Sequence, residues 1–381
     1  MQFALNEDQI AVRDMARDFA SEKIAPHAIK WDEEKYFPLE VMRDAAALGI
    51  GGIYVRDDVG GSGLSRLDAA LIFEALAQGC PTVSAFLSIH NMSAWMIDSF
   101  GNDGQRRKWL PRLCTMELVA SYCLTEPGAG SDAAALSTRA VKDGDHYVLN
   151  GQKQFISGSG ASDLYVVMAR TGGEGADGIS TLVIDRDTPG MSFGANERKM
   201  GWNAQPTRAV MFENARVPLA NRIGEEGDGF RIAMAGLDGG RLNIAACSLG
   251  GAQSALDKSL AYMSERKAFG KRLDQFQALQ FRVADMATEL EAARTFLWRA
   301  AAALDRKDPD AGKFCAMAKR FGTDVGFEVA NQALQLHGGY GYLAEYGIEK
   351  IVRDLRVHQI LEGTNEIMRL IISRKLIEGM R

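Results

Sequence analysis

The spacing of hydrophobic residues changes twice along this chain, and these changes constrain its fold more than any single motif does. Between about residues 5 and 115, apolar side chains recur with a helical spacing, as at Ile10, Met15 and Phe19 and again at Leu71, Phe73 and Leu76. Short runs of strand-forming residues follow, and from about residue 228 the helical spacing returns. A helix repeats about every 3.6 residues and a strand every second residue. The pattern therefore predicts helices over residues 1–116, a β-domain over 117–226 and helices over 227–381.

The middle region carries the turn and strand signals of a compact β-domain. Strand-forming residues are concentrated in four segments: 118–124, 164–168, 181–184 and 209–212. Asn150-Gly151 lies between two further apolar segments, and this dipeptide is a strong signal for a β-hairpin. We therefore predict a hairpin that turns at Asn150-Gly151, within a sheet that is closed or folded so that its edges are hidden.

The last region contains three long helical segments, over about 228–266, 275–304 and 309–336. The breaks between them are short and contain Gly or Pro. Long helices joined by short connections predict an antiparallel bundle. The predicted fold class is therefore α+β with several domains: a helical N-terminal domain, a β-domain and a C-terminal helical bundle.

Charge and composition exclude several classes of function. The net charge of -5 and the pI of about 5.7 argue against a nucleic-acid surface, which needs clustered basic residues. No run of about 18 apolar residues occurs, so no membrane span is predicted. The five cysteines form no Cys-x-x-Cys pair and the five histidines form no His-x-x-x-His pair. Neither a disulfide framework nor a metal site is predicted.

The first residues predict a capped helix rather than a targeting segment. Asn6 can cap a helix, and Gln9 follows three positions later, as in a capping box. The segment resembles neither a signal peptide nor an Arg-rich transit peptide. We expect a bacterial cytoplasmic protein, or a mitochondrial matrix protein if the chain is a processed eukaryotic one.

Glu362 is the strongest single candidate for a catalytic residue. It follows Ile360 and Leu361 and precedes Gly363. An apolar wall formed by Ile360 and Leu361 would raise the pKa of the carboxylate toward neutrality. A glutamate of that kind acts as a base near pH 7. The alternative is a solvent-facing glutamate at a corner between two helices.

Four further segments combine glycine with polar, charged or aromatic residues: Tyr122–Asp132, Asp238–Arg241, Arg266–Gly270 and Gln335–Tyr342. Each has a plain structural explanation, respectively a tight turn, a helix start, basic residues at a helix end and a glycine cap. Each also suits a ligand. Glycines admit close backbone approach, exposed backbone N–H groups bind phosphate, and an Arg beside an aromatic residue binds a stackable phosphate-bearing group.

Taken together and in this order, these segments resemble the acyl-CoA dehydrogenase family over essentially the whole chain. The likeness also includes residues 150–157 and 361–364. A narrower likeness, to members that act on isobutyryl-CoA, is carried by residues 201–208, 239–245 and 356–363. The resemblance implies a helical N-terminal domain, a β-barrel-like middle domain and a C-terminal four-helix bundle. It also implies FAD as cofactor, a homotetramer, and electron-transfer flavoprotein as electron acceptor.

The resemblance implies removal of two hydrogens across Cα–Cβ of an acyl-CoA, most simply isobutyryl-CoA in valine breakdown. Glu362 takes the α-proton in this scheme. Some relatives carry their base near Gly240 instead, where glycine cannot serve. The residues implied to bind the cofactor are Tyr122, Leu124, Thr125, Gly130, Ser131, Phe155, Ile156, Ser157, Arg266, Phe269, Phe276, Gln277, Gln335, Leu336, His337, Gly338, Gly339, Thr364, Asn365 and Glu366. Those implied to meet the acyl-CoA are Ser131, Asp238, Gly239, Gly240, Arg241, Gly363 and Arg374.

Three other functions remain open at this point. The first is a dehydrogenase that prefers butyryl-CoA or 2-methylbutyryl-CoA, because the width of the acyl pocket cannot be read from the sequence. The second is an acyl-CoA oxidase, although such chains are typically much longer. The third is a non-catalytic flavoprotein scaffold, against which the intact Glu362 and the complete set of cofactor residues argue.

Overall fold

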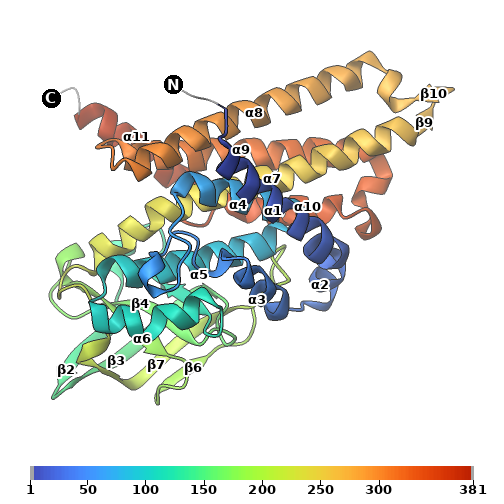
Figure 1. Cartoon of the computed structure of the whole chain (residues 1–381). Coiled ribbons are helices and arrows are strands. Elements are labelled where there is room, and N and C mark those ends of the chain that lie inside the picture. The colour runs from blue at the N-terminus through green and yellow to red at the C-terminus, as the bar shows by residue number, and fades with distance from the viewer. Residues whose placement is uncertain (1–3, 379–381) are drawn as a thin grey trace.

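The computed structural model describes residues 4–378, and its elements follow the predicted order of helices, sheet and helices (Figure 1). The outermost predicted positions, residues 1–3 and 379–381, lie outside the described residues. The predicted fold class is confirmed, whereas the exact domain boundaries near 117 and 227 stay a prediction. Among residues 4–378, no helix combines the length and the apolar character needed to cross a membrane.

The first region consists of helices whose starts are fixed by capping residues. The predicted cap at Asn6 is confirmed, because Gln9 N donates to Asn6 Oδ1 and Asn6 N donates to Gln9 Oε1. Ser65 and Asn102 cap later helices in the same way. These caps satisfy N–H groups that a helix start leaves unpaired. The helices are α1 (Glu7–Phe19), α2 (Ala28–Glu34), α3 (Leu39–Ala47), α4 (Arg66–Gly79), α5 (Pro81–Phe100) and α6 (Asp103–Cys114).

The middle region is a mixed sheet of eight strands. In sheet order the path is β6-β7-β3-β2-β4-β5-β8, and β1 pairs with β4 in parallel. Most other pairs are antiparallel, as expected for a sheet built largely from strands joined by short connections. The strands are β1 (Ala120–Cys123), β2 (Arg139–Asp143), β3 (His146–Ser157), β4 (Leu164–Arg170), β5 (Ile179–Asp185), β6 (Met191–Phe193), β7 (Thr207–Pro218) and β8 (Arg222–Ile223).

The predicted hairpin turn at Asn150-Gly151 is wrong. Both residues lie inside β3, where the register against β7 shifts between Leu149 and Gly151. A Cβ added to Gly151 would lie 2.6 Å from Thr138 Cα, so the chain needs glycine there to form a bulge. The strands β2 and β3 turn instead at Gly144, where φ is 61°. Asn150-Gly151 is therefore a bulge within a continuous strand, because β3 pairs with β7 both before and after this dipeptide.

The last region is built on three long helices that agree with the predicted segments to within a few residues. Helix α7 has buried residues along most of its length and becomes more exposed toward its C-terminal end. A short hairpin of β9 and β10 joins α7 to α8 and lies at the tip of the bundle (Figure 1). The elements are α7 (Gly229–Glu265), β9 (Lys267–Ala268), β10 (Lys271–Arg272), α8 (Gln277–Asp305), α9 (Ala311–His337), α10 (Ile348–Arg356) and α11 (Asn365–Glu378).

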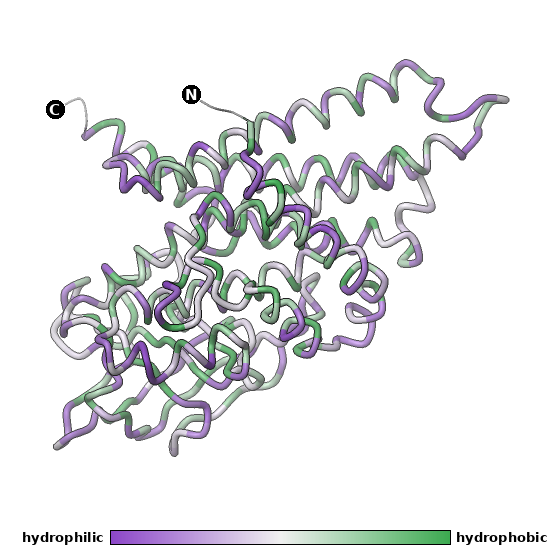
Figure 2. Tube along the Cα trace, in the orientation of Figure 1, coloured by the Kyte–Doolittle hydropathy of each residue, from purple (hydrophilic) through white to green (hydrophobic). Residues whose placement is uncertain are grey.

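Helices α5 and α7 connect the helical core to the core beneath the sheet. Each contributes buried residues to two apolar clusters, one with the other helices and one with β1, β4 and β5. Apolar positions accordingly line the packed helices in Figure 2, whereas the turn between β2 and β3 is hydrophilic. The three regions thus share two apolar cores, while a third cluster lies within the sheet region alone.

Asp354 on α10 is a buried junction between these regions. Its carboxylate accepts hydrogen bonds from Trp202 N at 2.7 Å and from Thr82 Oγ1 at 3.0 Å. Lys350 Nζ lies 2.6 Å from the same carboxylate. Trp202 precedes β7 and Thr82 begins α5, so one side chain joins all three parts of the chain.

We predict that Gly250→Ala lowers the free energy of unfolding by about 1–3 kcal/mol, because it overpacks the crossing of α7 and α4. A Cβ at Gly250 would lie 2.1 Å from Glu74 O. The matched control is Gly312→Ala at the start of α9, whose Cβ would lie 3.4 Å from Asp238 Oδ2. Urea denaturation of both variants measures the effect. Equal stability of the two variants would contradict this account of the crossing.

Candidate active site

Glu362 lies in the loop between the short turn Val357–Gln359 and helix α11. Its φ is 55°, and the φ of Gly363 is 88°. A left-handed φ is uncommon for a residue with a Cβ and is sustained only when the surroundings hold it. Two left-handed residues in succession turn the chain sharply just before α11.

The carboxylate of Glu362 lies against Gly240 in α7. A Cβ added to Gly240 would be 2.6 Å from Glu362 Oε2 and 3.0 Å from Met92 Sδ, so no larger residue fits. Glu362 Oε2 is buried and has no hydrogen-bond partner among residues 4–378. Burial raises the pKa of Glu362 to about 7, although Lys319 and Arg241 act in the opposite direction. A half-ionised carboxylate without a donor is poised to accept a proton near neutral pH.

The predicted apolar wall next to Glu362 is wrong for Ile360, which is 51% exposed. Leu361 does pack against the helical core. The carboxylate lies instead against Gly240 on α7, and Met92 on α5 lies beside the same glycine. Adjacent side chains in a sharp turn point in different directions, so the neighbours of a charge in sequence need not surround it.

Further buried polar atoms near Glu362 have no hydrogen-bond partner among the described residues. They are Tyr122 Oη, Arg241 Nε and Arg66 Nη1. Both Glu362 and Arg241 act on the pKa of Tyr122, which burial raises, and Arg66 Nη1 lies 2.4 Å from the Cβ position of Gly239. Buried polar atoms are nearly always satisfied in folded proteins. A group of such atoms indicates a place that a polar ligand or ordered water completes.

The predicted ligand turn after β1 is held against β3. Gln154 N donates to Thr125 O at 2.8 Å. The fully buried Lys153 donates to Leu124 O at 3.1 Å and to Glu126 Oε1 at 2.8 Å. Burial raises the pKa of Glu126, but Lys153 and donors from the following segment outweigh burial and lower the pKa to about 2. The turn is therefore tied to the sheet by a buried ion pair.

The outer side of this turn is open and ends beside an exposed aromatic residue. A Cβ at Gly130 would meet no atom within 4 Å, and Ser131 is exposed. Phe155 is 63% exposed with a φ of 59°, whereas Ile156 is buried and Ser157 O accepts from Ser121 Oγ at 2.6 Å. An exposed ring on a rigid strand offers a flat ligand a surface to stack on.

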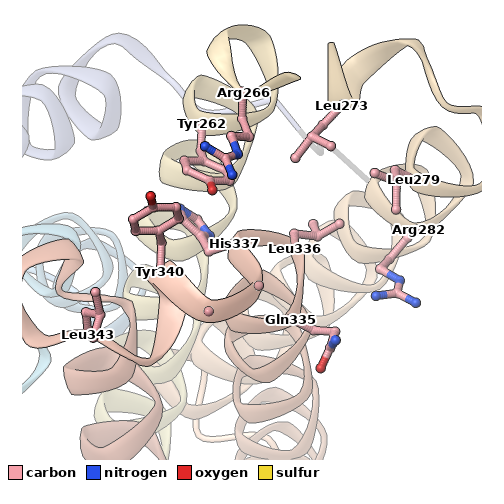
Figure 3. A pocket seen from close by; sticks show the side chains of 12 residues that line it. Tyr262, Arg266, Leu273, Leu279, Arg282, Gln335, Leu336, His337, Tyr340 and Leu343 are labelled. Atoms are coloured by element: carbon pink, nitrogen blue, oxygen red, sulfur yellow. The ribbon is translucent and has the colours of Figure 1, made fainter. Parts of the chain in front are cut away.

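A second group of predicted residues lines a cavity of about 520 Å³ at the end of α9 (Figure 3). Arg266 lies 5.2 Å from the ring of Tyr340, and His337 stacks on Tyr262 with 4.5 Å between ring centroids. Gly338 and Gly339 leave open space where a side chain would be. The lining residues are Tyr262, Arg266, Leu273, Leu279, Arg282, Gln335, Leu336, His337, Gly338, Gly339, Tyr340 and Leu343.

Other predicted residues lie beside these two groups. Phe269 in the β9–β10 hairpin is 96% exposed, with its ring 6.3 Å from that of Phe276, and Gln277 begins α8. Asp238 pairs with Arg241 at 2.6 Å inside α7, so this segment does not start a helix.

Three predicted cofactor residues, Thr364, Asn365 and Glu366, lie at the start of α11 and have different surroundings. Thr364 Oγ1 accepts from Ile367 N at 3.3 Å, which caps the helix. Glu366 and Arg374 are exposed on α11. The side chain of Asn365, in contrast, is buried and hydrogen-bonded to α9, so it faces the protein interior.

Three family models match the chain in the same order as its regions. They describe the acyl-CoA dehydrogenase N-terminal domain over residues 6–117, the middle domain over 121–215 and the C-terminal domain over 227–377.

The chain belongs to the acyl-CoA dehydrogenase family.

Individual relatives of this acyl-CoA dehydrogenase cover it almost completely. A mitochondrial isobutyryl-CoA dehydrogenase from Dictyostelium discoideum is 60% identical over 98% of this chain and 90% of the relative. Its counterpart from Bos taurus is 56% identical, with the same coverage of 98% and 90%. Butyryl-CoA dehydrogenase from Megasphaera elsdenii has a solved structure with a TM-score of 0.96 at 38% identity, covering 99% and 100% of the two chains. PigA, solved with FAD and proline, has a TM-score of 0.95 at 31% identity, covering 99% of each chain.

These comparisons confirm the predicted family, the predicted enzyme class and FAD as cofactor. The chain fits such a cofactor. The exposed Phe155, the open glycine turn and the buried Tyr122 hydroxyl, which has no partner among the described residues, belong to the segments where the resemblance expects it. The roles of the individual residues stay predictions.

The structure also reveals site residues that the sequence reasoning missed. Lys319 on α9 hydrogen-bonds to the loop that carries Glu362, and Met92 touches the Gly240 position. The sequence did contain a signal for Lys319, because Cys315, Lys319 and Thr323 are spaced four residues apart along one face of a helix. A lysine in such a buried stripe is rarely found without a partner. No local pattern distinguishes Met92 from an ordinary core residue.

We predict that Lys153→Met destabilises the protein by about 3–5 kcal/mol, because it leaves the Glu126 carboxylate buried without its cation. Glu126 has a folded pKa of about 2, below its ordinary value of 4.5, so its contribution to stability is present above pH 4.5 and is lost as pH falls toward 2. That acid-dependent loss shrinks in the variant. Urea denaturation at pH 7 and at pH 4 measures both effects.

The matched control is Lys142→Met, which breaks an exposed ion pair of 2.9 Å with Glu226. Exposed pairs contribute less than about 1 kcal/mol, so this variant should remain close to wild type. Similar losses in the two variants would show that the buried pair does not hold the turn.

Proposed function

We propose that this chain is an FAD-dependent dehydrogenase of a short branched-chain acyl-CoA, most simply isobutyryl-CoA, with Glu362 as the catalytic base. The observation that carries the proposal is the buried Oε2 of Glu362, which lies against Gly240 without a hydrogen-bond partner among residues 4–378 and belongs to a carboxyl group whose pKa is about 7. A base of that pKa is ionised often enough at neutral pH and still binds a proton strongly. Membership of the family supports the reaction type.

In the proposed reaction, Glu362 removes a proton from the acyl Cα and holds it on its carboxylate. The thioester carbonyl oxygen gains negative charge as the proton leaves. The backbone N–H of Glu362 makes no hydrogen bond within the described chain, so it is free to donate to that oxygen. Such a donor stabilises the developing charge by several kcal/mol when water is excluded. Bound FAD supplies the acceptor for the hydride that leaves Cβ.

The residues around Glu362 orient the substrate and exclude water. Arg241, held by Asp238, and the buried hydroxyl of Tyr122 provide polar walls. Gly239 and Gly240 let the acyl group pass close to α7, because any side chain there would fill the space beside the carboxylate. Burial of this kind raises the pKa of Glu362 and strengthens each hydrogen bond made in the site.

We propose that the cofactor lies between two subunits. The flavin end would contact the turn after β1 and the Phe155 strand. The adenine-diphosphate end would occupy the cavity that Arg266 and His337 line. The end of α7 before β9 lies at the tip of the bundle, away from the sheet (Figure 1). Since the two groups of residues lie at different ends of one chain, a second copy would supply one of them. This supports the predicted homotetramer, whose exposed Phe269 hairpin would reach the neighbouring subunit.

The electron acceptor is proposed to be electron-transfer flavoprotein. A solved structure described as an electron transferring flavoprotein of Acidaminococcus fermentans matches this chain with a TM-score of 0.96 at 40% identity, covering 99% of both chains. The proposed location is the bacterial cytoplasm, or the mitochondrial matrix if the chain is a processed eukaryotic protein. The matrix alternative is supported by the two mitochondrial relatives.

The preference for isobutyryl-CoA is supported by the two relatives at 60% and 56% identity. We expect isobutyryl-CoA to bleach the bound flavin faster and more completely than butyryl-CoA or 2-methylbutyryl-CoA during anaerobic titration. Bleaching mainly by a straight chain would keep the dehydrogenase and remove it from valine breakdown. Oxygen consumption without an added acceptor would indicate an oxidase, and a flavin that none of the three reduces would indicate a scaffold.

We predict that Glu362→Gln lowers kcat at least about 100-fold while FAD remains bound, because the amide cannot accept the α-proton. Glu117→Gln is the matched control, since Glu117 is exposed and pairs only with Arg112 at 2.8 Å. Flavin absorbance measures cofactor content, and acceptor reduction measures turnover. Normal turnover of Glu362→Gln would refute its role as the base.

A further inference from the structure

Lys319 is a fully buried lysine on the third turn of α9, and no carboxylate lies within ion-pair distance of it among the described residues. Its Nζ instead donates to Gly363 O at 2.8 Å and to Asn365 Oδ1 at 2.9 Å. A buried ammonium group is costly unless it is paired and hydrogen-bonded. A charge kept in such a place needs an explanation beyond packing.

Both acceptors of Lys319 follow Glu362 closely in the chain, one in the same loop and one at the start of α11. Gly363 is the next residue in the chain, and both it and Glu362 have a left-handed φ. Asn365, the first residue of α11, accepts from Lys319 on one atom and donates through Nδ2 to Asp324 Oδ1 at 2.7 Å. The loop is therefore held from α9 on the C-terminal side of the glutamate.

The same helix also holds the loop on the N-terminal side of the glutamate. Gln359 Nε2 donates to Asp324 Oδ1 at 2.8 Å. Thr323 Oγ1 accepts from Asn365 Nδ2 at 3.0 Å. Residues of two successive turns of α9 thus fix the chain before and after Glu362, which maintains its uncommon backbone conformation.

Lys319 is a cation that acts on the pKa of Glu362, and it has no carboxylate partner among residues 4–378. Arg241, the other cation that acts on Glu362, is paired with Asp238 at 2.6 Å. Burial lowers the pKa of Lys319 to about 8, and Glu362 acts against this change. The remaining titratable groups that interact with Glu362 or Lys319 are Tyr54, Tyr122, Cys247, Asp324, His358 and Glu366. Arg66 lies one step further away, beside Tyr54 and Gly239.

We propose that Lys319 positions the base. Its ammonium group anchors the Gly363 carbonyl and the Asn365 side chain, and it sets a positive charge without a carboxylate partner beside the Glu362 carboxylate. This inference rests on the proposed role of Glu362 as the base. Lys319 touches neither substrate nor cofactor in this scheme, so it acts only through Glu362.

The test is the pH dependence of kcat/KM for isobutyryl-CoA in the holoenzyme. In wild type, we expect kcat/KM to rise with pH through an inflection near 7, because only the ionised Glu362 accepts the proton and burial raises its pKa to about 7. Removing the cation disfavours that ionised form. We expect Lys319→Met to move the inflection upward by about one pH unit or more. A shift of one unit leaves about one-eleventh of the base ionised at pH 7 instead of half, an about fivefold loss that alkaline pH restores.

Lys319→Gln separates charge from anchoring, because glutamine keeps a donor for the Gly363 carbonyl but carries no charge. We expect it to show the same upward shift with a smaller loss at the alkaline limit than Lys319→Met. Lys313→Met is the matched control on the same helix. Lys313 is paired with Asp310 at 2.9 Å, away from Glu362, and its inflection should stay at the wild-type pH.

An unchanged inflection in both Lys319 variants, with kcat/KM lowered equally at every pH, would overturn the proposal and leave Lys319 a structural residue. Failure of both variants to fold and retain FAD would overturn it in the same way. Glu362→Gln is assayed beside them. If that variant turns over normally, the assignment of the base fails first, and this outcome is distinguishable from a failure confined to Lys319.

Discussion

The site depends on the removal of one carboxylate from water. Glu362 Oε2 reaches α7 only because residue 240 has no side chain, and burial there brings the pKa of Glu362 to about 7. Desolvation alone would favour the neutral acid, so the surrounding cations must return part of the lost stabilisation of the ionised form. Reactivity at neutral pH thus results from a balance between the burial of Glu362 and the positive charges of Lys319 and Arg241. The fold sets that balance by bringing α7, α9 and the loop of Glu362 together.

Much of the architecture could be predicted because periodicity is a local property. The three long helices and the Asn6 cap follow directly from spacing and from capping chemistry. The hairpin at Asn150-Gly151 was predicted wrongly, since β7, which pairs with β3 on both sides of that bulge, is distant in sequence. Turn propensity loses to tertiary pairing at such a position.

Site residues that belong to a local sequence motif could be predicted, whereas residues that reach the site only through the packing of distant helices could not. Glu362 and the Arg266 region were identified from local sequence and from the family resemblance. Lys319 and Met92 were missed, because their importance arises from the crossing of helices far apart in the chain. Ile360 shows the converse, since it is adjacent to the site in sequence and yet exposed.

The buried position of Asp354 limits how the three regions of such a chain can be exchanged during evolution. Its buried carboxylate needs donors from α5, from the segment before β7 and from its own helix. A fragment that lacks any one of them would carry an unsatisfied buried charge. The three parts, although each resembles a module, cannot be exchanged singly with an unrelated partner. We therefore expect the amino-acid sequence to vary mainly at the outer turns, and we expect the three regions to be retained together in one chain.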